Sequence, residues 1–401
     1  MRNLVKGFFV IFLLMLIVPS GARADLDLWT ISNPSPSATT FNDLYDDGTT
    51  MVAVGDGGSI FYSTSGTSWT KATSGSFANL YGVTKGADGS GNTLYVAVGA
   101  TDDSTGYGTI LTSSDLATWT KIDSGVTAKL NDIVYGNSMF IAVGDKLSSK
   151  GTILTSTNGS TWTNNSSTST AANLNAITYA SDTFVVAGDT ESSADAAMAT
   201  STDGSTWTAR DAIGAANIYD LVYTNSYVIG VGALNSYNIV YSSNKGVSWA
   251  GASNLGLDLY VARGGYSTTT SGETDCDYLV SGKNSTDAVG KIYCLNGFSG
   301  GSNYQNVTSL YSDAIYNGLA YRSSGPLYVA VGANGAILSA SSTSATKIAK
   351  SKWTSRKSAG VTTANWFNDV KNFGGNNFIA VGENGAVWVK NSASNYVWVG
   401  Q

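Results

Sequence analysis

Short apolar runs that end in glycine recur along this chain, and polar, turn-forming residues follow each of them. Consecutive glycines of the series are separated by 44, 45, 44, 44, 50, 50 and 50 residues. A period of this length predicts a repeated supersecondary unit. The eight glycines are Gly55, Gly99, Gly144, Gly188, Gly232, Gly282, Gly332 and Gly382.

The third repeat shows the unit most clearly. Four short runs rich in β-branched and aromatic residues, LNDIVY, MFIAVG, GTILTS and TWTNNS, are separated by Gly, Asn, Ser and Asp. Such runs predict β-strands, and the residues between them predict hairpin turns. Each repeat is therefore expected to form a four-stranded antiparallel meander, whose strands we name a, b, c and d in chain order.

Strand b, which carries the glycine, is apolar at nearly every position. Continuous apolar character predicts a strand that neighbouring sheets cover on both faces. Meanders stacked in this way around an axis form a β-propeller. We therefore predict an all-β fold, a single β-propeller of four-stranded antiparallel blades over residues 25–401, with eight blades preferred and seven as the alternative.

Tryptophans follow the same repeat and predict how the ring closes. Trp69, Trp119, Trp162, Trp207 and Trp249 begin strand d in repeats one to five. Trp29 precedes the first strand a by a similar interval, so the segment LDLWTIS is expected to supply a strand d to the last blade. An N-terminal strand in this place would remove the open edges of the ring. YVWVG near the C-terminus competes for the same place, which leaves a five-stranded closing blade as an alternative.

The N-terminal residues carry a targeting signal. Arg2 and Lys6 precede an apolar run from Phe8 to Val18, and Ala22-Arg23-Ala24 resembles a cleavage site. This pattern predicts that residues 1–24 are a signal peptide and that the protein is exported, to a periplasm or out of the cell. We expect no membrane span in the remainder.

Charge and cysteine content narrow the expected partners. The formal net charge is −6, which disfavours nucleic acid as a ligand. We expect a monomer that binds a protein or a glycan. Cys276 and Cys294 are the only cysteines. Their places on two successive predicted strands, in an exported chain, predict a disulfide between them.

The tryptophan turns resemble a known motif. STDGSTW in repeat four and SSNKGVSW in repeat five are similar to the Asp-box, S-x-D-x-G-x-[TS]-W. The chain thus resembles the Asp-box propellers of bacterial neuraminidase repeats and, through its VAVG-x-x-G pattern, the photosystem II assembly factor-like propellers. This resemblance implies the propeller fold, with the Asp-box turns in a structural role away from any active centre.

Enzymatic chemistry finds little support in the sequence. The resemblance would imply an arginine triad and an RIP-like motif in a sialidase, but the mature chain has four arginines and no such motif. The absence of histidine excludes histidine-based triads and most zinc sites. We therefore predict no catalytic residues and no bound cofactor. A carbohydrate-active Asp-box protein, either a glycoside hydrolase or a lectin, is the alternative.

Strand a begins with Asn and Asp residues in several repeats. In a propeller this strand lines the central channel, so these side chains could form an oxygen-rich ring able to hold calcium. The other interpretation is that they bond nearby backbone amides. The candidate metal ligands are Asp43, Asp132, Asp220 and Asp369.

The connections between strands b and c lengthen in repeats two to six. Meander geometry places them on the face where strand a begins, opposite the tryptophan turns. Long loops on a rigid scaffold are common binding sites, so we predict that this acidic face contacts a partner. The function predicted is an exported, non-catalytic, protein-binding or assembly scaffold. Its candidate contact residues are Asp102, Asp103, Asp145, Asp189, Glu191 and Asp195.

Overall fold

The computed structural model describes much of the chain, with the longest continuous part in its first half. The described residues are 29–31, 39–166, 170–190, 196–211, 213–214, 217–224, 226–233, 236–253, 255, 257–264, 278–284, 290–295, 304–306, 315–322, 327–341, 353–355, 366–373, 377–383 and 387–390. The predicted signal peptide and Cys276 lie outside them, so export and the disulfide stay predictions. No helix in the described part has the length and apolar character needed to cross a membrane.

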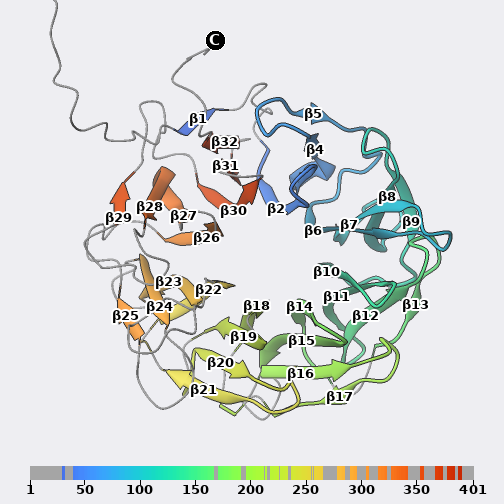
Figure 1. Cartoon of the computed structure of the whole chain (residues 1–401). Helices are drawn as coiled ribbons and strands as arrows, with labels where there is room; N and C mark the ends of the chain where they lie inside the picture. The colour runs from blue at the N-terminus through green and yellow to red at the C-terminus, as the bar shows by residue number, and fades with distance from the viewer. Residues whose placement is uncertain are drawn as a thin grey trace, which may run out of the picture.

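The described strands form eight four-stranded antiparallel sheets arranged as blades around a central channel (Figure 1). This is the β-propeller that the glycine spacing predicts. Blades 1 to 4 are β2 (Phe41–Asp46), β3 (Met51–Gly55), β4 (Ile60–Ser63) and β5 (Thr70–Lys71); β6 (Leu80–Ala87), β7 (Thr93–Thr101), β8 (Gly108–Ser113) and β9 (Thr120–Asp123); β10 (Leu130–Gly136), β11 (Met139–Leu147), β12 (Lys150–Ser156) and β13 (Thr163–Asn164); and β14 (Leu174–Ala180), β15 (Thr183–Thr190), β16 (Ala196–Ser201) and β17 (Thr208–Ala209).

The remaining blades repeat this order, with strand a nearest the axis (Figure 1). They are β18 (Ile218–Thr224), β19 (Tyr227–Gly232), β20 (Ile239–Ser242) and β21 (Ala250–Ser253); β22 (Leu257–Gly264), β23 (Tyr278–Asn284), β24 (Gly290–Leu295) and β25 (Tyr304–Asn306); β26 (Tyr316–Arg322), β27 (Leu327–Gly332), β28 (Ala336–Ser341) and β29 (Trp353–Ser355); and β30 (Phe367–Phe373), β31 (Asn377–Gly382) and β32 (Val387–Lys390). Two 3₁₀ turns, η1 (Asp56–Gly58) and η2 (Ala333–Gly335), join strands b and c in blades 1 and 7.

The N-terminal strand closes the ring. β1 (Trp29–Ile31) pairs with β32, with Thr30 opposite Val389, and so supplies strand d of blade 8. This confirms the closure predicted from Trp29. YVWVG lies outside the described residues, so its competing placement in the closing blade is not tested.

The core consists of apolar layers between adjacent blades. In β3 and along the central part of β11 every residue is buried. Side chains that point to either face of the strand are therefore covered. Val52 and Val54 of blade 1 pack against Val83 and Ala97 of blade 2. A strand covered on both faces has no polar side, which explains the continuous apolar runs in the sequence.

The repeated glycines allow strand b to meet strand a at a bulge. The register of strand a shifts at its second residue, between Phe41 and Asp43 in blade 1. A Cβ on Gly55 would lie 2.0 Å from the carbonyl oxygen of Thr40, and one on Gly144 would lie 2.1 Å from that of Lys129. The next residue then donates its amide to the same carbonyl, as Asp145 does to Lys129 at 2.9 Å. Backbone contact, and not an unusual φ, therefore requires glycine.

Tryptophan turns join strands c and d in blades 1 to 5. The Trp207 indole N–H donates to the Gly204 carbonyl at 3.0 Å, and the Gly204 amide donates to Ser201 Oγ at 2.8 Å. Asp203 accepts hydrogen bonds from the Ser205 and Thr206 amides. The turn is thus closed by its own side chains, with Trp207 as a buried anchor.

Candidate functional site

The two faces of the ring are defined by its connections. We call the side with the b–c and d–a connections the loop face, and the side with the a–b hairpins and the tryptophan turns the turn face. Strand a begins on the loop face in every blade, so its bulge lies beside the channel mouth there. The candidate site is this loop face.

Asparagines at the bulge connect neighbouring blades. The Asn131 side-chain amide donates to Asp145 at 3.0 Å and to the Leu174 carbonyl of the next blade at 2.8 Å. Asn42 and Asn175 make the equivalent pairs of bonds. Across the closure, Asn368 donates to the Phe41 carbonyl at 2.7 Å. These asparagines therefore hold the ring together.

The aspartates proposed as metal ligands bond backbone amides. Asp43 accepts from the amides of Leu44 and Val83, and Asp132 accepts from those of Ile133 and Ile177. Asp220 accepts from Ala262. The amides of Val83, Ile177 and Ala262 belong to the next blade, so each carboxylate joins two blades. The amide-bonding interpretation describes these groups.

The remaining candidate, Asp369, is a buried carboxylate at the closure. It accepts from the Val370 amide and forms an ion pair with Lys371 at 3.0 Å. No group of three or more His, Cys, Asp or Glu residues in the described part of the chain is arranged to hold a metal ion. Calcium binding by these four residues stays a prediction.

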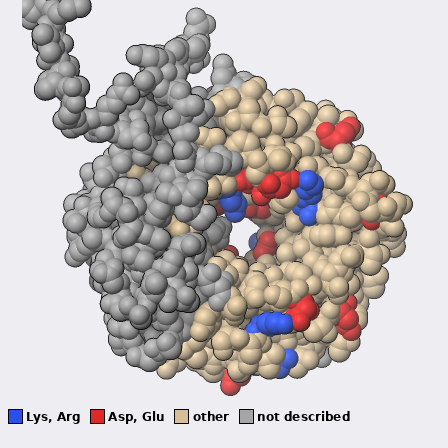
Figure 2. Space-filling view, viewed as in Figure 1, with Lys and Arg blue, Asp and Glu red and all other residues tan. Residues whose placement is uncertain are grey.

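Burial raises the pKa of two aspartates in strand a. Desolvation raises the pKa of Asp132 to about 7, and the charges of Asp43 and Asp220 contribute to the rise. Desolvation also raises the pKa of Asp43, against the opposing effect of Lys371. Figure 2 shows the channel open through the ring, with acidic and basic side chains beside its mouth.

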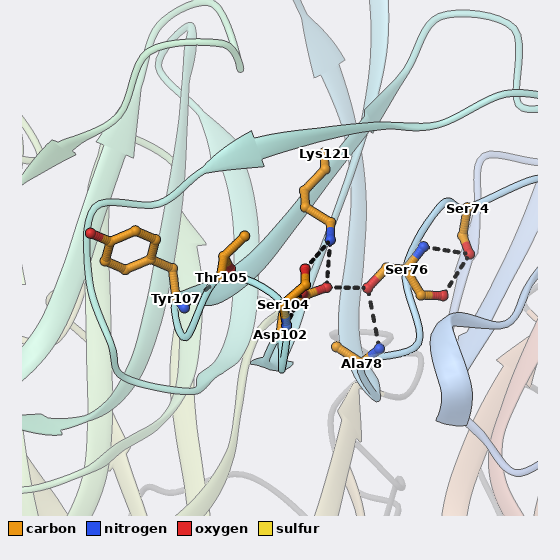
Figure 3. A network of polar contacts seen from close by, with 8 residues as sticks. All are labelled: Ser74, Ser76, Ala78, Asp102, Ser104, Thr105, Tyr107 and Lys121. Atoms are coloured by element: carbon orange, nitrogen blue, oxygen red, sulfur yellow. Dashed lines mark hydrogen bonds and ion pairs between the residues drawn. The ribbon is translucent and has the colours of Figure 1, made fainter.

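Asp102, predicted as a partner contact, instead belongs to an internal network (Figure 3). Its carboxylate accepts from Lys121 Nζ at 2.7 Å and from Ser76 Oγ at 3.0 Å, and it also bonds Ser104. Its side chain is only 7% exposed, and the bonds from Lys121 and Ser104 lower its pKa. Asp102 therefore fixes the b–c loop of blade 2 to the connection that enters the blade.

The other predicted contact residues fall into three groups. Asp145 and Asp189 accept bonds from the bulge asparagines described above and so serve the inter-blade frame. Asp103 is exposed on the loop face. Glu191 and Asp195 lie outside the described residues. Contact with a partner stays a prediction.

Some of the predicted long loops are extended strands. β11 continues past Gly144 to Leu147, where it pairs with Lys150 of β12 across a two-residue turn. Ser148 and Ser149 in that turn have φ values of 50° and 68°. The sequence predicts the segment GDKLSSKG as a lengthened b–c connection, but backbone pairing extends the hairpin into it.

Exposed aromatic side chains on the loop face were missed by the sequence prediction. Phe77 is 92% exposed in the connection between β5 and β6, and Tyr107 is 38% exposed in the blade 2 loop. Of the six large hydrophobic side chains exposed in the described residues, only Val247 lies on the turn face. The five on the loop face are Phe77, Tyr107, Tyr219, Tyr237 and Trp366. These aromatic residues depart from the repeated sequence pattern, and this departure could have predicted them.

Tyrosine replaces asparagine at three bulges. Tyr81, Tyr219 and Tyr260 occupy this position in blades 2, 5 and 6. The acidic residue that pairs with Asn in blades 1, 3 and 4 is also absent there, since Ala100, Ala233 and Lys283 stand in its place. In blade 6 the Ser281 hydroxyl donates to the Tyr316 carbonyl of the next blade at 2.8 Å. In blade 6, Ser281 thus makes an inter-blade bond, and the Tyr260 side chain at the bulge is not needed for it.

One solved structure with a TM-score above 0.5 supports the fold, and two others show weaker similarity. YCF48 bound to a D1 peptide has a TM-score of 0.51 and 14% identity, over 91% of this chain and 96% of that one. The WD40 propeller of Doa1 gives 0.48 and 12%, over 91% and 97%. The propeller of Myceliophteria thermophila Cps50 (Swd1) gives 0.46 and 9%, over 90% and 99%. No family model and no curated protein matches the chain.

Proposed function

We propose that this protein is a non-catalytic, protein-binding scaffold and that its partner docks on the loop face. The observation that supports the proposal is that five of the six large hydrophobic side chains exposed in the described residues lie on that face. Exposed tyrosine, tryptophan and phenylalanine are enriched where proteins bind one another, because each buries a large area with little loss of side-chain freedom.

Hydrogen bonds hold the backbone on both sides of Phe77. Phe77 follows Ser76 directly, and Ser76 is bonded to Asp102, which Lys121 and Ser104 also hold. On the other side, Asn79 accepts a bond from the Gly57 amide of blade 1 at 2.9 Å. A contact residue fixed in this way loses little conformational entropy when it binds, and this increases affinity.

The same interpretation explains why the loop face carries few candidates for catalysis. The described carboxylates there are mostly engaged with amides, asparagines or lysines. YCF48, a propeller of comparable fold, has been solved with a D1 peptide, which supports a peptide- or protein-binding role. We further propose that binding takes place after export, on the basis of the pattern in residues 1–24.

Affinity capture with matched variants tests this proposal. The full chain is used to capture partners from its native source, alongside a loop-face variant carrying Phe77→Ser, Tyr107→Ser and Trp366→Ser. The control is Val247→Ser, which removes a 50% exposed side chain from the turn face. We expect the control to retain the captured protein and the loop-face variant to lose it.

Two further assays separate the alternatives. Retention of the same partner by the loop-face variant would contradict the proposed face. Binding to a glycan array, abolished by the same three substitutions, would favour a lectin. Turnover of fluorogenic glycosides by the full chain would contradict a non-catalytic role and favour a glycoside hydrolase.

A further inference from the structure

The bulge tyrosines show a pattern of contacts with cations. Lys129 Nζ lies 5.4 Å from the centre of the Tyr81 ring, and Lys283 Nζ lies 5.9 Å from that of Tyr260. An ammonium group over a tyrosine ring is attracted by the negative face of the π-system. Two of the three bulge tyrosines are thus paired with a lysine of this chain.

Tyr219 differs from the other two. Its ring stacks on Tyr260, with the centroids 6.0 Å apart and the planes inclined by 20°, and its side chain is 36% exposed at the channel mouth. No lysine or arginine among the described residues lies over it. Tyr219 is therefore a partly exposed ring with no described lysine or arginine over it, whereas Tyr81 and Tyr260 each have a lysine over the ring.

Two carboxylates act on Tyr219, while Lys283 lies over the neighbouring Tyr260 ring. Desolvation raises the pKa of its hydroxyl, a bond from Asn217 opposes the rise, and the charges of Asp258 and Asp189 increase it. Asp189 comes from the preceding blade, where the amides of Asn173 and Asn175 orient its carboxylate. Because both carboxylates act on Tyr219, a positive group beside the ring would be favoured by the ring and by these charges.

We propose that Tyr219, together with the carboxylate of Asp189, binds a lysine or arginine side chain of the partner protein. This inference rests on the proposed function and specifies the chemistry of its partner. The partner's cation takes the place over Tyr219 that Lys129 and Lys283 take over Tyr81 and Tyr260. The acidic net charge of the chain also favours approach of a basic segment.

Immobilised peptides test the site without knowledge of the natural partner. The full chain is passed over short peptides that differ at one central position, occupied by arginine, lysine, norleucine or glutamate. We expect about three- to tenfold more binding to the arginine and lysine peptides than to the norleucine peptide. This preference should weaken at high salt, because exposed charges are then screened.

Variants assign the preference to Tyr219. Tyr219→Ala should remove it, and Tyr219→Phe should retain most of it, since the aromatic face remains. Val247→Ser is the control, because it removes an exposed apolar side chain from the turn face, outside the proposed binding surface. Equal binding of arginine, lysine and norleucine peptides, or an unchanged preference in a folded Tyr219→Ala protein, would overturn the inference.

The two proposals fail in different ways. Loss of partner capture by the triple loop-face variant, with no arginine or lysine preference on the peptides, would leave the docking face intact and remove only the cation site. Retention of the partner by the triple variant would contradict the docking face itself.

Discussion

The turn face and the loop face are built from the same repeats but differ in how far those repeats agree. On the turn face, the five tryptophan turns of blades 1 to 5 share one hydrogen-bond pattern, with indole-to-carbonyl distances of 2.9–3.1 Å. On the loop face, Asn gives way to Tyr at some bulges, and the connections differ in length. Agreement between repeats marks structure, and disagreement marks the candidate site.

The largest effect is expected where the turn face anchors the core. Trp207→Ala should lower the free energy of unfolding by about 3–5 kcal/mol, because it empties a buried site between blades. Trp207→Phe should cost less, since it keeps an aromatic ring and loses mainly the bond to Gly204. Urea unfolding checks both. Equal stability of Trp207→Ala and the wild type would contradict a structural turn face.

The next largest effect on stability is expected at the glycine that recurs where strands a and b meet, beneath the loop face. Gly144→Ala should destabilise by about 3 kcal/mol, because the new Cβ would clash with the Lys129 carbonyl. Gly89→Ala is the control, as its Cβ would meet its nearest neighbour at 3.4 Å, an ordinary contact. Thermal unfolding compares the two. Similar melting temperatures would mean that strands a and b separate easily at the bulge.

Removal of an inter-blade asparagine should have a moderate effect. Asn131→Ala leaves Asp145 and the Leu174 carbonyl without this donor, at an expected cost of about 1–3 kcal/mol. A double-mutant cycle with Asp145→Ala isolates the bond between the two side chains. Additive losses would show that Asn131 and Asp145 do not interact in solution.

A smaller effect is expected in the pH dependence of stability, through Asp132. The folded-state pKa of Asp132, about 7, exceeds its ordinary value of 3.8, so the folded state binds the extra proton between these limits. Its contribution to stability is therefore full below about pH 4 and is lost as pH rises to 7. We expect a loss of about 1–2 kcal/mol, moderated by solvent in the channel.

Carboxyl groups whose pKa is lowered in the folded state change the stability in the opposite direction, and at lower pH. Asp102 and Asp203 have lowered pKa values, through Lys121 and the Thr206 amide respectively. Their contribution is present above about pH 4 and is lost on further acidification. Melting temperature should therefore be highest near pH 4, and Asp132→Asn should flatten the decline above it. Asp103→Asn, an exposed change, should leave the decline unaltered.

The smallest effect on stability should come from the proposed contact surface. Phe77→Ser should change the free energy of unfolding by less than about 0.5 kcal/mol, because the ring is 92% exposed. A large destabilisation would assign Phe77 to the frame and remove it from the proposed surface. Urea unfolding of this variant beside the Trp207 variants completes the comparison.

The sequence predicted those features that depend on local pattern. Runs such as MVAVG predicted buried central strands, and the place of Trp29 predicted ring closure by β1. The aspartates of strand a bond amides of the next blade, and these contacts do not follow from local pattern. Val83, the amide partner of Asp43, is 40 residues away along the chain.

The candidate site was less predictable for the same reason. Acidity suggested Asp102 as a contact residue, but a lysine and a serine from other segments engage it. Exposure of Phe77 could not be read from its apolar character, which in this chain usually means burial. Only comparison of the aligned bulges separates Tyr219 from its structural Asn counterparts.

Hydrogen–deuterium exchange of the full chain, with and without the captured partner, tests the central claim most directly. The account predicts protection of the loop face, in segments 76–80, 102–107 and 217–219. It also predicts unchanged exchange in the tryptophan turns at 64–68 and 202–206. Protection confined to the tryptophan turns would contradict the claim that the variable face is the binding face.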